Sequence, residues 1–312
     1  MKIQFIVNPT AGLGRSLVLW RKIERYLVNS LPAGTVQVAY TEGPGHATEL
    51  ALNRVEQGFD RVVAVGGDGT VQEVANALVM NGKSPALGVI PAGKGNDFAR
   101  SLGMPNSPRA IVEALKTDAT RVLDLGWIST STGSRYFVNM VGIGFDGAVA
   151  REVSMYRHGL GAKTAYLRGI IRVLGSYRLP YVSVVSDSIT IEGKSLLLAV
   201  GNTPYCARGI KLVPMAKPDD GKLSICWCGD IRPLHVLFLL PKAFKGKHIT
   251  HPKVICGDVR ELTVVSRDDE DVWIHADGEV VGTLPATIKV IPGAIRVLDV
   301  RAARARAAPN VP

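Results

Sequence analysis

The sequence predicts two parts: an α/β domain with a mostly parallel sheet over residues 1–125, and a β-rich domain over residues 126–312. In the first part, apolar strand-like runs alternate with helical segments, which is typical of a parallel sheet covered by helices on both faces. From about residue 125, short β-rich runs separated by turn residues predict an antiparallel sandwich or barrel.

The elements of the first part follow from this alternation. Strands are expected over Lys2–Val7, Val36–Tyr40, Arg61–Val65 and Ala86–Ile90. Helical periodicity predicts helices over Ser16–Leu31, His46–Gln57, Thr70–Met80 and Pro108–Lys116. Ligands of such sheets gather at the carboxyl ends of the strands, so a site is expected in the loops there.

The second part is expected to consist mostly of strands. They are predicted over Tyr136–Val141, Tyr181–Val185, Leu196–Val200, Leu223–Trp227, Glu261–Val265, Val272–His275 and Thr287–Ile291. Helical segments interrupt them near Lys163–Leu174 and Pro233–Phe244. The tail Arg301–Pro312 alternates Arg with Ala and ends in prolines, so we expect it to fray or to pack loosely back on the first domain.

Composition narrows the class of protein. The chain is 46% hydrophobic, and no run reaches the roughly 20 apolar residues of a membrane span, so we expect a globular cytoplasmic protein. The first residues are too few and too polar-flanked for a signal peptide and are interpreted as a strand. The four cysteines show no metal-ligand spacing; Cys226 and Cys228 flank Trp227 at a strand period and are expected as buried thiols.

The net charge of +10 indicates an anionic partner, for which nucleotide, nucleic acid and membrane surface all qualify. Nucleic acid is the weakest of the three, because the basic residues are dispersed, aromatic content is only 6%, and no nucleic-acid module is present. The sequence leaves the oligomeric state open, a homodimer included.

One loop carries the strongest chemical signal. Gly66-Gly67-Asp68-Gly69-Thr70 directly follows an apolar strand and precedes a helix, where backbone N–H groups favour phosphate. Asp68 would repel phosphate unless a cation lay between them, which indicates a metal–nucleotide site; the alternative is that Asp68 caps the helix. The glycine-rich loops Asn8–Gly14 and Pro91–Asp97 end at the same sheet edge, and this convergence favours the site.

These loops, with three later elements, resemble the diacylglycerol kinase catalytic family, in particular its bacterial lipid kinases, with sphingosine kinases more distant. The later elements are Gly142-Ile143-Gly144-Phe145-Asp146, then Pro214-Met215-Ala216 with Asp219-Asp220-Gly221, and Asp277-Gly278-Glu279 before Leu284-Pro285-Ala286. All of them run in family order. The Gly-Gly-Asp-Gly-Thr loop is shared with NAD kinases, whereas Gly95-Asn96-Asp97-Phe98-Ala99-Arg100 and the Asp-Asp-Gly turn separate the two families.

The resemblance implies an α/β domain like that of NAD kinases and phosphofructokinases, a C-terminal antiparallel β-sandwich, and ATP- and Mg²⁺-dependent phosphorylation of a diacylglycerol-like lipid. The protein is then expected to act peripherally at an anionic membrane surface. The ATP site implied comprises Asn8, Gly12, Thr41, Gly66, Gly67, Asp68, Gly69, Thr70, Glu73, Gly93, Lys94 and Asn96. Asp68 is expected to bind the catalytic Mg²⁺, directly or through water.

The proton acceptor implied by the resemblance is Asp277 or Glu279, although an Asp-Gly-Glu turn is also common in hairpins. His275, on the same strand face as Asp277, is expected as a solvated or satisfied strand histidine. A structural Mg²⁺ is implied at Asp220, with the main-chain carbonyls of Lys217 and Lys222; the alternative is a turn without a metal.

Two departures from the family pattern matter. Lys94 replaces a threonine that contacts the nucleotide, and Gln72 replaces an asparagine. Lys94 could place its charge on phosphate or point to solvent. Other functions therefore stay open: an NAD kinase, or a catalytically weak nucleotide- or lipid-binding regulator.

Two basic clusters are candidates for membrane docking. Arg168 and Arg172 lie four residues apart on a helix whose other face carries Leu167, Ile170, Ile171 and Leu174. The second cluster combines Lys242, Lys245, Lys247, His248, His251 and Lys253. Basic groups near an anionic leaflet contribute about 1 kcal/mol each; the alternative is a solvated helix face and a solvated loop.

Overall fold

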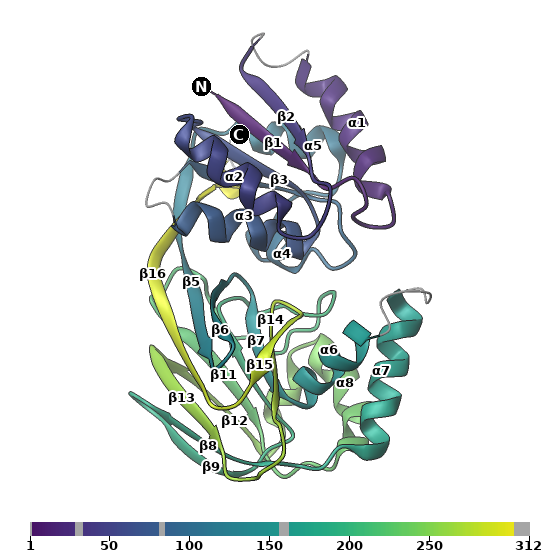
Figure 1. The fold of residues 1–312 in the computed structure, drawn as a ribbon, viewed down its shortest axis with the longest axis vertical. Coiled ribbons are helices and arrows are strands. Elements are labelled where there is room, and N and C mark those ends of the chain that lie inside the picture. The colour runs from purple at the N-terminus through teal and green to yellow at the C-terminus, as the bar shows by residue number, and fades with distance from the viewer. Residues whose placement is uncertain (1, 29–33, 81–84, 156–161, 303–312) are drawn as a thin grey trace, which may run out of the picture. The chain divides into compact units, whose positions relative to one another are not determined.

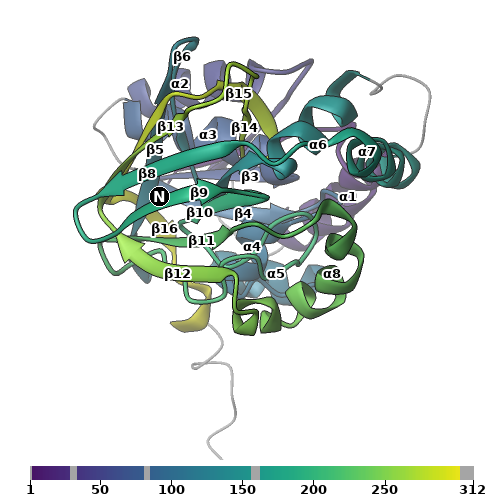
Figure 2. The ribbon, with the colours of Figure 1, turned by 90° about the horizontal axis from the view of Figure 1, so that it is seen from below.

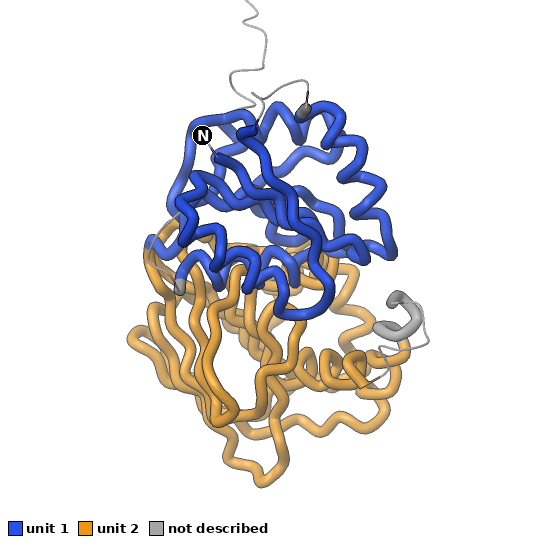
Figure 3. Tube along the Cα trace, turned by 45° about the horizontal axis from the view of Figure 1, so that its top comes forward, with its two compact units in different colours: residues 1–123, 293–312 blue, residues 124–292 orange. Residues whose placement is uncertain are grey.

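A computed structural model describes residues 2–28, 34–80, 85–155 and 162–302 of the chain. It divides into two compact units, Met1–Leu123 with Gly293–Pro312, and Asp124–Pro292 (Figure 3). Within the described residues, no helix is both long enough and apolar enough to cross a membrane.

Unit 1 is built on a parallel sheet in the order β2 (Val36–Tyr40), β1 (Ile3–Val7), β3 (Arg61–Gly66) and β4 (Ala86–Pro91). The end of β16 (Ala286–Leu298) adds to β4 in parallel. Strands β1 and β3 are buried along their whole length, as the apolar runs predict. The α/β fold with a mostly parallel sheet is confirmed.

Five helices cover this sheet: α1 (Arg15–Val28), α2 (His46–Glu56), α3 (Asp68–Met80), α4 (Asp97–Leu102) and α5 (Pro108–Leu115). Helix α2 packs against α3 and α1 against α5, and Figure 2 shows α3 and α5 on opposite sides of β3 and β4. The sequence placed the start of α3 at Thr70, two residues too late, and missed α4, whose six residues are too few to show a helical period. Residues 29–31 of the expected first helix lie outside the described residues.

Unit 2 contains two antiparallel sheets (Figure 1). One has the order β12 (Val254–Val259), β11 (Leu223–Cys228), β10 (Leu197–Gly201), β7 (Met140–Gly144), β14 (Trp273–Ala276) and β15 (Glu279–Thr283). The other has the order β16, β13 (Glu261–Ser266), β8 (Tyr181–Ser186) and β9 (Thr190–Lys194), and β5 (Thr120–Thr130) pairs with β16 and with β6 (Gly133–Phe137). Their facing side chains share one apolar core, so the predicted antiparallel sandwich is confirmed.

The outer face of the six-stranded sheet is covered by helices. These are α6 (Phe145–Met155), α7 (Ala162–Ser176), η1 (Pro233–His235), α8 (Val236–Phe244) and η2 (Lys247–Thr250). Ile225 and Trp227 point into the sandwich core, whereas Cys226 and Cys228 alternate with them and pack under the helices. The expectation of two buried thiols on one strand face is confirmed, and a sheet buried on both faces explains why β11 is uniformly apolar.

Several elements of unit 2 differ from the sequence expectation. The expected strand Tyr136–Val141 is two strands, β6 and β7, separated by Val138 and Asn139. Helix α6 was missed because Gly142, Gly144 and Gly147 weaken the helical pattern around its start. The pairing strands β9, β12 and β15 were also missed, since they are only partly buried and carry polar residues. Of the predicted tail, residues 303–312 lie outside the described residues.

Candidate active site

The loops at the carboxyl edge of the unit 1 sheet are tied together by Asn8. Its Nδ2 donates to Thr70 Oγ1 at 3.1 Å, which joins the loop after β1 to the loop after β3. Its Oδ1 accepts the backbone N–H groups of Thr10 and Ala11, each at 3.1 Å. Asn8 thus uses both ends of its amide to fix the first loop against the start of α3.

Glycines let these loops approach one another. A Cβ on Gly12 would lie 2.5 Å from the carbonyl oxygen of Ala92, and a Cβ on Gly66 would lie 2.5 Å from Thr70 Oγ1. Gly93 is the tightest position, because its Cβ would lie 2.3 Å from the Cα of Gly67. These glycines are required by contacts within the protein, not only by the approach of a ligand.

Asp68 lies where two helices begin. It is the first residue of α3, and its Oδ1 accepts the backbone N–H of Phe98, in the first turn of α4, at 3.1 Å. Asn96 precedes α4 at φ 57°, with its Oδ1 accepting the N–H of Gly93 at 2.8 Å. Asp68 therefore bonds to a neighbouring helix. The side chain of Lys94 is exposed on this loop.

Glu73 and Thr41 belong to the neighbouring part of the edge, around the start of α2. Glu73 Oε2 accepts the N–H of Ala47 at 3.0 Å, and Thr48 Oγ1 donates to the carbonyl of Glu73 at 3.2 Å. The Thr41 side chain is buried at the end of β2, where its N–H donates to Val7 O at 2.9 Å. In this structure Glu73 holds the α2 amino end in place.

This edge can bind an anion together with a cation. The amino end of α3 offers partial positive charge, and Asp68 and Thr70 place a carboxylate and a hydroxyl beside it. Mg²⁺ commonly takes only one or two protein carboxylates and completes its shell with phosphate oxygens and water. At this edge a Mg²⁺ would take Asp68 as a protein ligand and the rest of its ligands from phosphate and water.

In unit 2, Asp277 and Gly278 form the two-residue turn between β14 and β15, with φ of 51° and 85°. Both values are positive, as a type I′ hairpin requires. The Asp277 carboxylate accepts the N–H groups of Val138 (2.7 Å), Asn139 (2.8 Å) and Met140 (3.1 Å). Burial raises its pKa, and the three N–H groups oppose that rise. Asp277 thereby fixes the connection between β6 and β7.

Glu279, two residues later, is placed differently. It begins β15, its side chain is 43% exposed, and its Oε2 pairs with Arg135 Nη1 at 2.9 Å. A single guanidinium bond orients this carboxylate and leaves it accessible. The two candidate acceptors therefore differ: Asp277 is engaged by backbone, and Glu279 faces solvent.

A buried His–Asp pair lies next to this turn. His275 Nε2 lies 2.8 Å from Asp146 Oδ2, and His275 Nδ1 accepts the N–H of Gly278 at 3.2 Å. A Cβ on Gly142 would come within 2.4 Å of Nε2, so glycine there makes room for the pair. His275 is thus a satisfied strand histidine and not a solvated one. Sequence reasoning assigned no role to Asp146; glycine at position 142, within the family motif, was the available signal.

The pKa values of this pair move in opposite directions. Burial by itself raises the pKa of Asp146, but the charge and hydrogen bond of His275 outweigh burial and lower it. For His275, burial lowers the pKa, and the charge and hydrogen bond of Asp146 outweigh burial and raise it.

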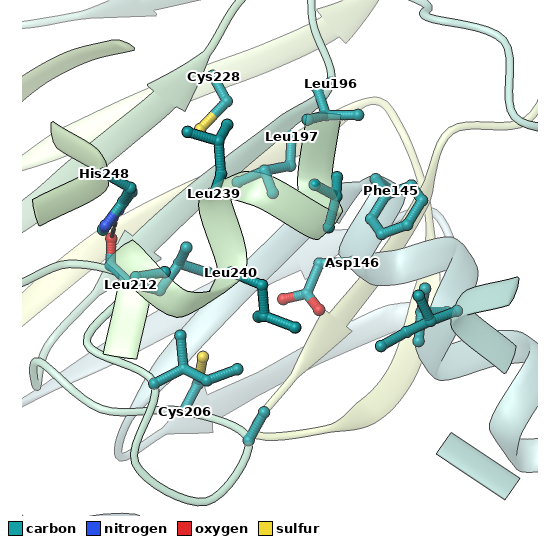
Figure 4. Close-up of a pocket in the computed structure, with 16 residues that line it drawn as sticks. Phe145, Asp146, Leu196, Leu197, Cys206, Leu212, Cys228, Leu239, Leu240 and His248 are labelled. Atoms are coloured by element: carbon teal, nitrogen blue, oxygen red, sulfur yellow. Dashed lines mark hydrogen bonds between the residues drawn. The ribbon is translucent and has the colours of Figure 1, made fainter. Parts of the chain in front are cut away.

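Asp146 also lines an apolar pocket under the helices of unit 2 (Figure 4). The pocket holds about 690 Å³ of empty space, part of it open to solvent. Apolar side chains from α6, α8 and the segment that leads into β10 line the same pocket, among them Phe145, Val149, Leu196, Leu239 and Leu240. Among the residues that line it, Asp146 is the one carboxylate.

The predicted metal turn lies elsewhere in unit 2. Asp220 Oδ1 accepts the N–H of Lys222 at 3.1 Å, and Asp124 Oδ2 accepts the N–H of Gly221 at 2.7 Å. Burial raises the pKa of Asp220, the N–H of Lys222 opposes this rise, and the carboxylates of Asp258 and Asp124 add to it. A cation would relieve this concentration of negative charge, so the turn fits the implied metal.

Comparison with known proteins identifies the family. The diacylglycerol kinase catalytic domain matches residues 2–128, and the YegS C-terminal NAD kinase beta sandwich-like domain matches residues 139–299. A diacylglycerol kinase of Staphylococcus haemolyticus is 31% identical over 91% of this chain and 83% of its own length. This chain belongs to the diacylglycerol kinase family. It is a lipid kinase, as the order of its motifs predicts.

Further relatives agree with this family assignment. A diacylglycerol kinase of Staphylococcus epidermidis is 31% identical to this chain, over 91% of this chain and 88% of its own length. A solved structure from Bacillus anthracis matches with a TM-score of 0.78 at 25% identity, covering 95% and 94% of the two chains. The crystal structure of a diacylglycerol kinase from the same organism, at 23% identity and a TM-score of 0.72, shows the same fold.

Proposed function

We propose that this lipid kinase uses Mg²⁺ and ATP to phosphorylate the hydroxyl of a diacylglycerol-like lipid at an anionic membrane surface. The observation that carries the proposal is the apolar pocket of unit 2 with the Asp146 carboxylate in its wall. Apolar walls suit acyl chains, and one polar group among them suits orientation of a hydroxyl. The names of the relatives support the same acceptor class.

Asp146 would orient the acceptor. Its Oδ2 is occupied by His275, and its second oxygen has no hydrogen-bond partner among the residues that the structure describes. The charge and hydrogen bond of His275 lower the pKa of Asp146 and keep this carboxylate ionised, so it can accept a charge-assisted hydrogen bond from the acceptor hydroxyl. His275 would act as a positioning residue, since it fixes the rotamer and the charge of Asp146.

Glu279 would take the proton of the acceptor hydroxyl. The hydroxyl oxygen forms a bond to the γ-phosphorus, the bond from that phosphorus to the bridging oxygen breaks, and ADP leaves with the electron pair. Glu279 is oriented by Arg135 and accessible, whereas the Asp277 carboxylate is held by three N–H groups. Asp277 would therefore shape the turn that presents Glu279.

The nucleotide would bind at the carboxyl edge of unit 1. There the α3 amino end and the glycine loops would hold the phosphates, and Asp68 would hold Mg²⁺. When bound, Mg²⁺ neutralises charge on the transferred phosphoryl group. Asp220, with the carbonyls of Lys217 and Lys222, would hold a second Mg²⁺ in a structural role.

A radiolabelled-ATP assay tests the proposal. The full chain is incubated with vesicles that contain diacylglycerol, phosphatidylglycerol, ceramide or sphingosine, and separately with NAD. We expect phosphorylated diacylglycerol, and a loss of at least tenfold in kcat/KM for Asp146→Asn. NAD phosphorylation without a lipid product would establish the NAD kinase alternative. If the wild type binds ATP tightly without turnover and Lys94→Thr restores turnover, the chain is instead a catalytically weak nucleotide- or lipid-binding regulator.

A further inference from the structure

We infer that α8 and its flanking turns form the surface by which this enzyme docks on an anionic bilayer, with Leu237 and Phe238 inserted among the lipids. The reason why the enzyme would dock rests on the proposed function. The docking surface itself follows from the residues of α8 and does not depend on that function.

The first observation is that α8 carries apolar residues on its exposed side as well as on its buried side. Leu237 and Phe238 are 53% and 74% exposed, and Leu234 in the preceding turn is 64% exposed. On the opposite side of the helix, Val236, Leu239, Leu240 and Ala243 line the pocket. Large exposed apolar side chains that lie together mark a surface for a protein partner or a membrane. Figure 2 shows α8 at the margin of unit 2.

The second observation is charge, which identifies the partner. Residues 231–257 contain no Asp or Glu but include Arg232, Lys242, Lys245, Lys247 and Lys253. Exposed Leu and Phe bordered by lysines combine apolar area that can be buried in lipid with attraction to anionic headgroups, the two contributions that set the strength of binding at a membrane interface. Each basic residue near an anionic leaflet strengthens binding by about fivefold. A protein partner would have to offer an apolar surface and negative charge at matching positions. An anionic bilayer has both, in its acyl chains and its headgroups.

This surface differs from the basic clusters expected from the sequence. His248 is buried, so it does not belong to the exposed cluster, and Lys253 lies 3.6 Å from Asp230. The α7 cluster is less suited to docking, because Arg172 pairs with Glu152 at 3.3 Å and Ile170 is buried. The side chain of Leu167 lies outside the described residues.

The position of α8 explains why docking would serve the pocket. One side of the helix lines the pocket and the other is exposed, so α8 is the wall between the pocket and its surroundings. Insertion of the exposed side would bring the pocket next to lipid acyl chains. A lipid could then reach Asp146 without crossing water.

Vesicle sedimentation tests the surface without turnover. The full chain is mixed with phosphatidylcholine vesicles, with or without 30 mol% phosphatidylglycerol, in the absence of ATP and diacylglycerol. We expect the wild type to bind the anionic vesicles, and the double variant Leu237→Ser/Phe238→Ser to bind at least about a hundredfold more weakly, which is what the loss of two buried apolar side chains gives. Val185→Ser, at a 53% exposed position on β8, is the matched control and should bind like the wild type.

A second variant guards against misfolding of the first. Phe238→Trp keeps an aromatic ring, and its fluorescence should shift to the blue with anionic vesicles and be quenched by brominated acyl chains. Unchanged binding of the double variant, or no spectral shift, would overturn the inference. Turnover of a dispersed short-chain diacylglycerol should be retained by the double variant. If the wild type docks but phosphorylates no lipid, the proposed function fails and the docking surface stands.

Discussion

Gly67 and Gly93 are in backbone contact: a Cβ on Gly93 would lie 2.3 Å from the Cα of Gly67. The two glycines belong to successive loops, after β3 and after β4. The same loops are joined by the Ala92 N–H to Gly66 O bond at 2.8 Å and by the Asp68 bond to Phe98 N–H. The starts of α3 and α4 are thereby fixed relative to each other, which places Asp68 in one geometry.

Gly93→Ala should break this contact. Overpacking of this kind costs about 1–3 kcal/mol, and separation of the loops would move Asp68. We expect a lower free energy of unfolding in urea and at least a tenfold weaker ATP affinity by calorimetry. Gly175→Ala is the matched control, because its Cβ would meet no atom within 4 Å and it lies inside α7 of unit 2. A Gly93→Ala enzyme with wild-type stability and affinity would contradict the argument.

Much of unit 1 could be predicted because its strands are buried on both sides. Runs such as residues 62–65 in β3 are continuously apolar, which marks a strand regardless of its neighbours. The split between β6 and β7 could not be predicted, since it depends on the Asp277 carboxylate binding Val138 and Asn139 from far along the chain. Long-range hydrogen bonds of this kind leave no local pattern.

Glu279→Gln and Asp277→Asn should separate the proton acceptor from the positioning residue. For Glu279→Gln, we expect kcat to fall by about 10²–10⁴-fold with an unchanged melting temperature, because this carboxylate is partly exposed. Asp277→Asn leaves buried N–H groups poorly satisfied, which costs about 1–3 kcal/mol, and should lower the melting temperature. Arg135→Lys, which keeps the charge beside Glu279, is the control. A wild-type rate in Glu279→Gln would remove it from the mechanism.

The candidate site was only partly accessible from sequence. The family motifs contained both Asp277 and Glu279, but only the three N–H contacts of Asp277 distinguish them. The contact between Asp146 and His275 joins residues 129 positions apart, and its one local trace is the small residue at Gly142. The order of the motifs identifies the candidate residues, and the hydrogen bonds that each residue makes distinguish their roles.

Removal of Mg²⁺ should destabilise the Asp220 turn. Burial, followed by the negative charges of Asp258 and Asp124, raises the pKa of Asp220. A bound cation would relieve the repulsion between these carboxylates. We expect EDTA to lower the melting temperature of the wild type by several degrees, and Asp220→Asn to abolish this Mg²⁺ dependence. Asp269→Asn, at another exposed carboxylate of unit 2, should keep it. Equal Mg²⁺ responses in wild type and Asp220→Asn would exclude the turn as a metal site.

The His275–Asp146 pair should make stability depend on pH in a defined window. In the neutral ring, Nδ1 accepts the Gly278 N–H and Nε2 donates to Asp146. Protonation of Nδ1 gives up the first bond, worth about 1 kcal/mol, and gains a charge-assisted pair, which is about twice as strong. This balance agrees in sign with the raised pKa of His275 and the lowered pKa of Asp146.

The direction of the pH effect follows from the two shifts. Because the folded-state pKa of His275 is raised, its contribution is fully present below the ordinary value of 6.5 and is lost as pH rises through the folded value. Because that of Asp146 is lowered, its contribution is present above 3.8 and is lost as pH falls through the folded value. We expect the unfolding free energy of the wild type to exceed that of His275→Gln most between about pH 4 and 6.5. Urea titrations at pH 5, 6.5, 8 and 9 measure this difference, and a constant value across the series would mean that the pKa of His275 is the same in the folded and unfolded states.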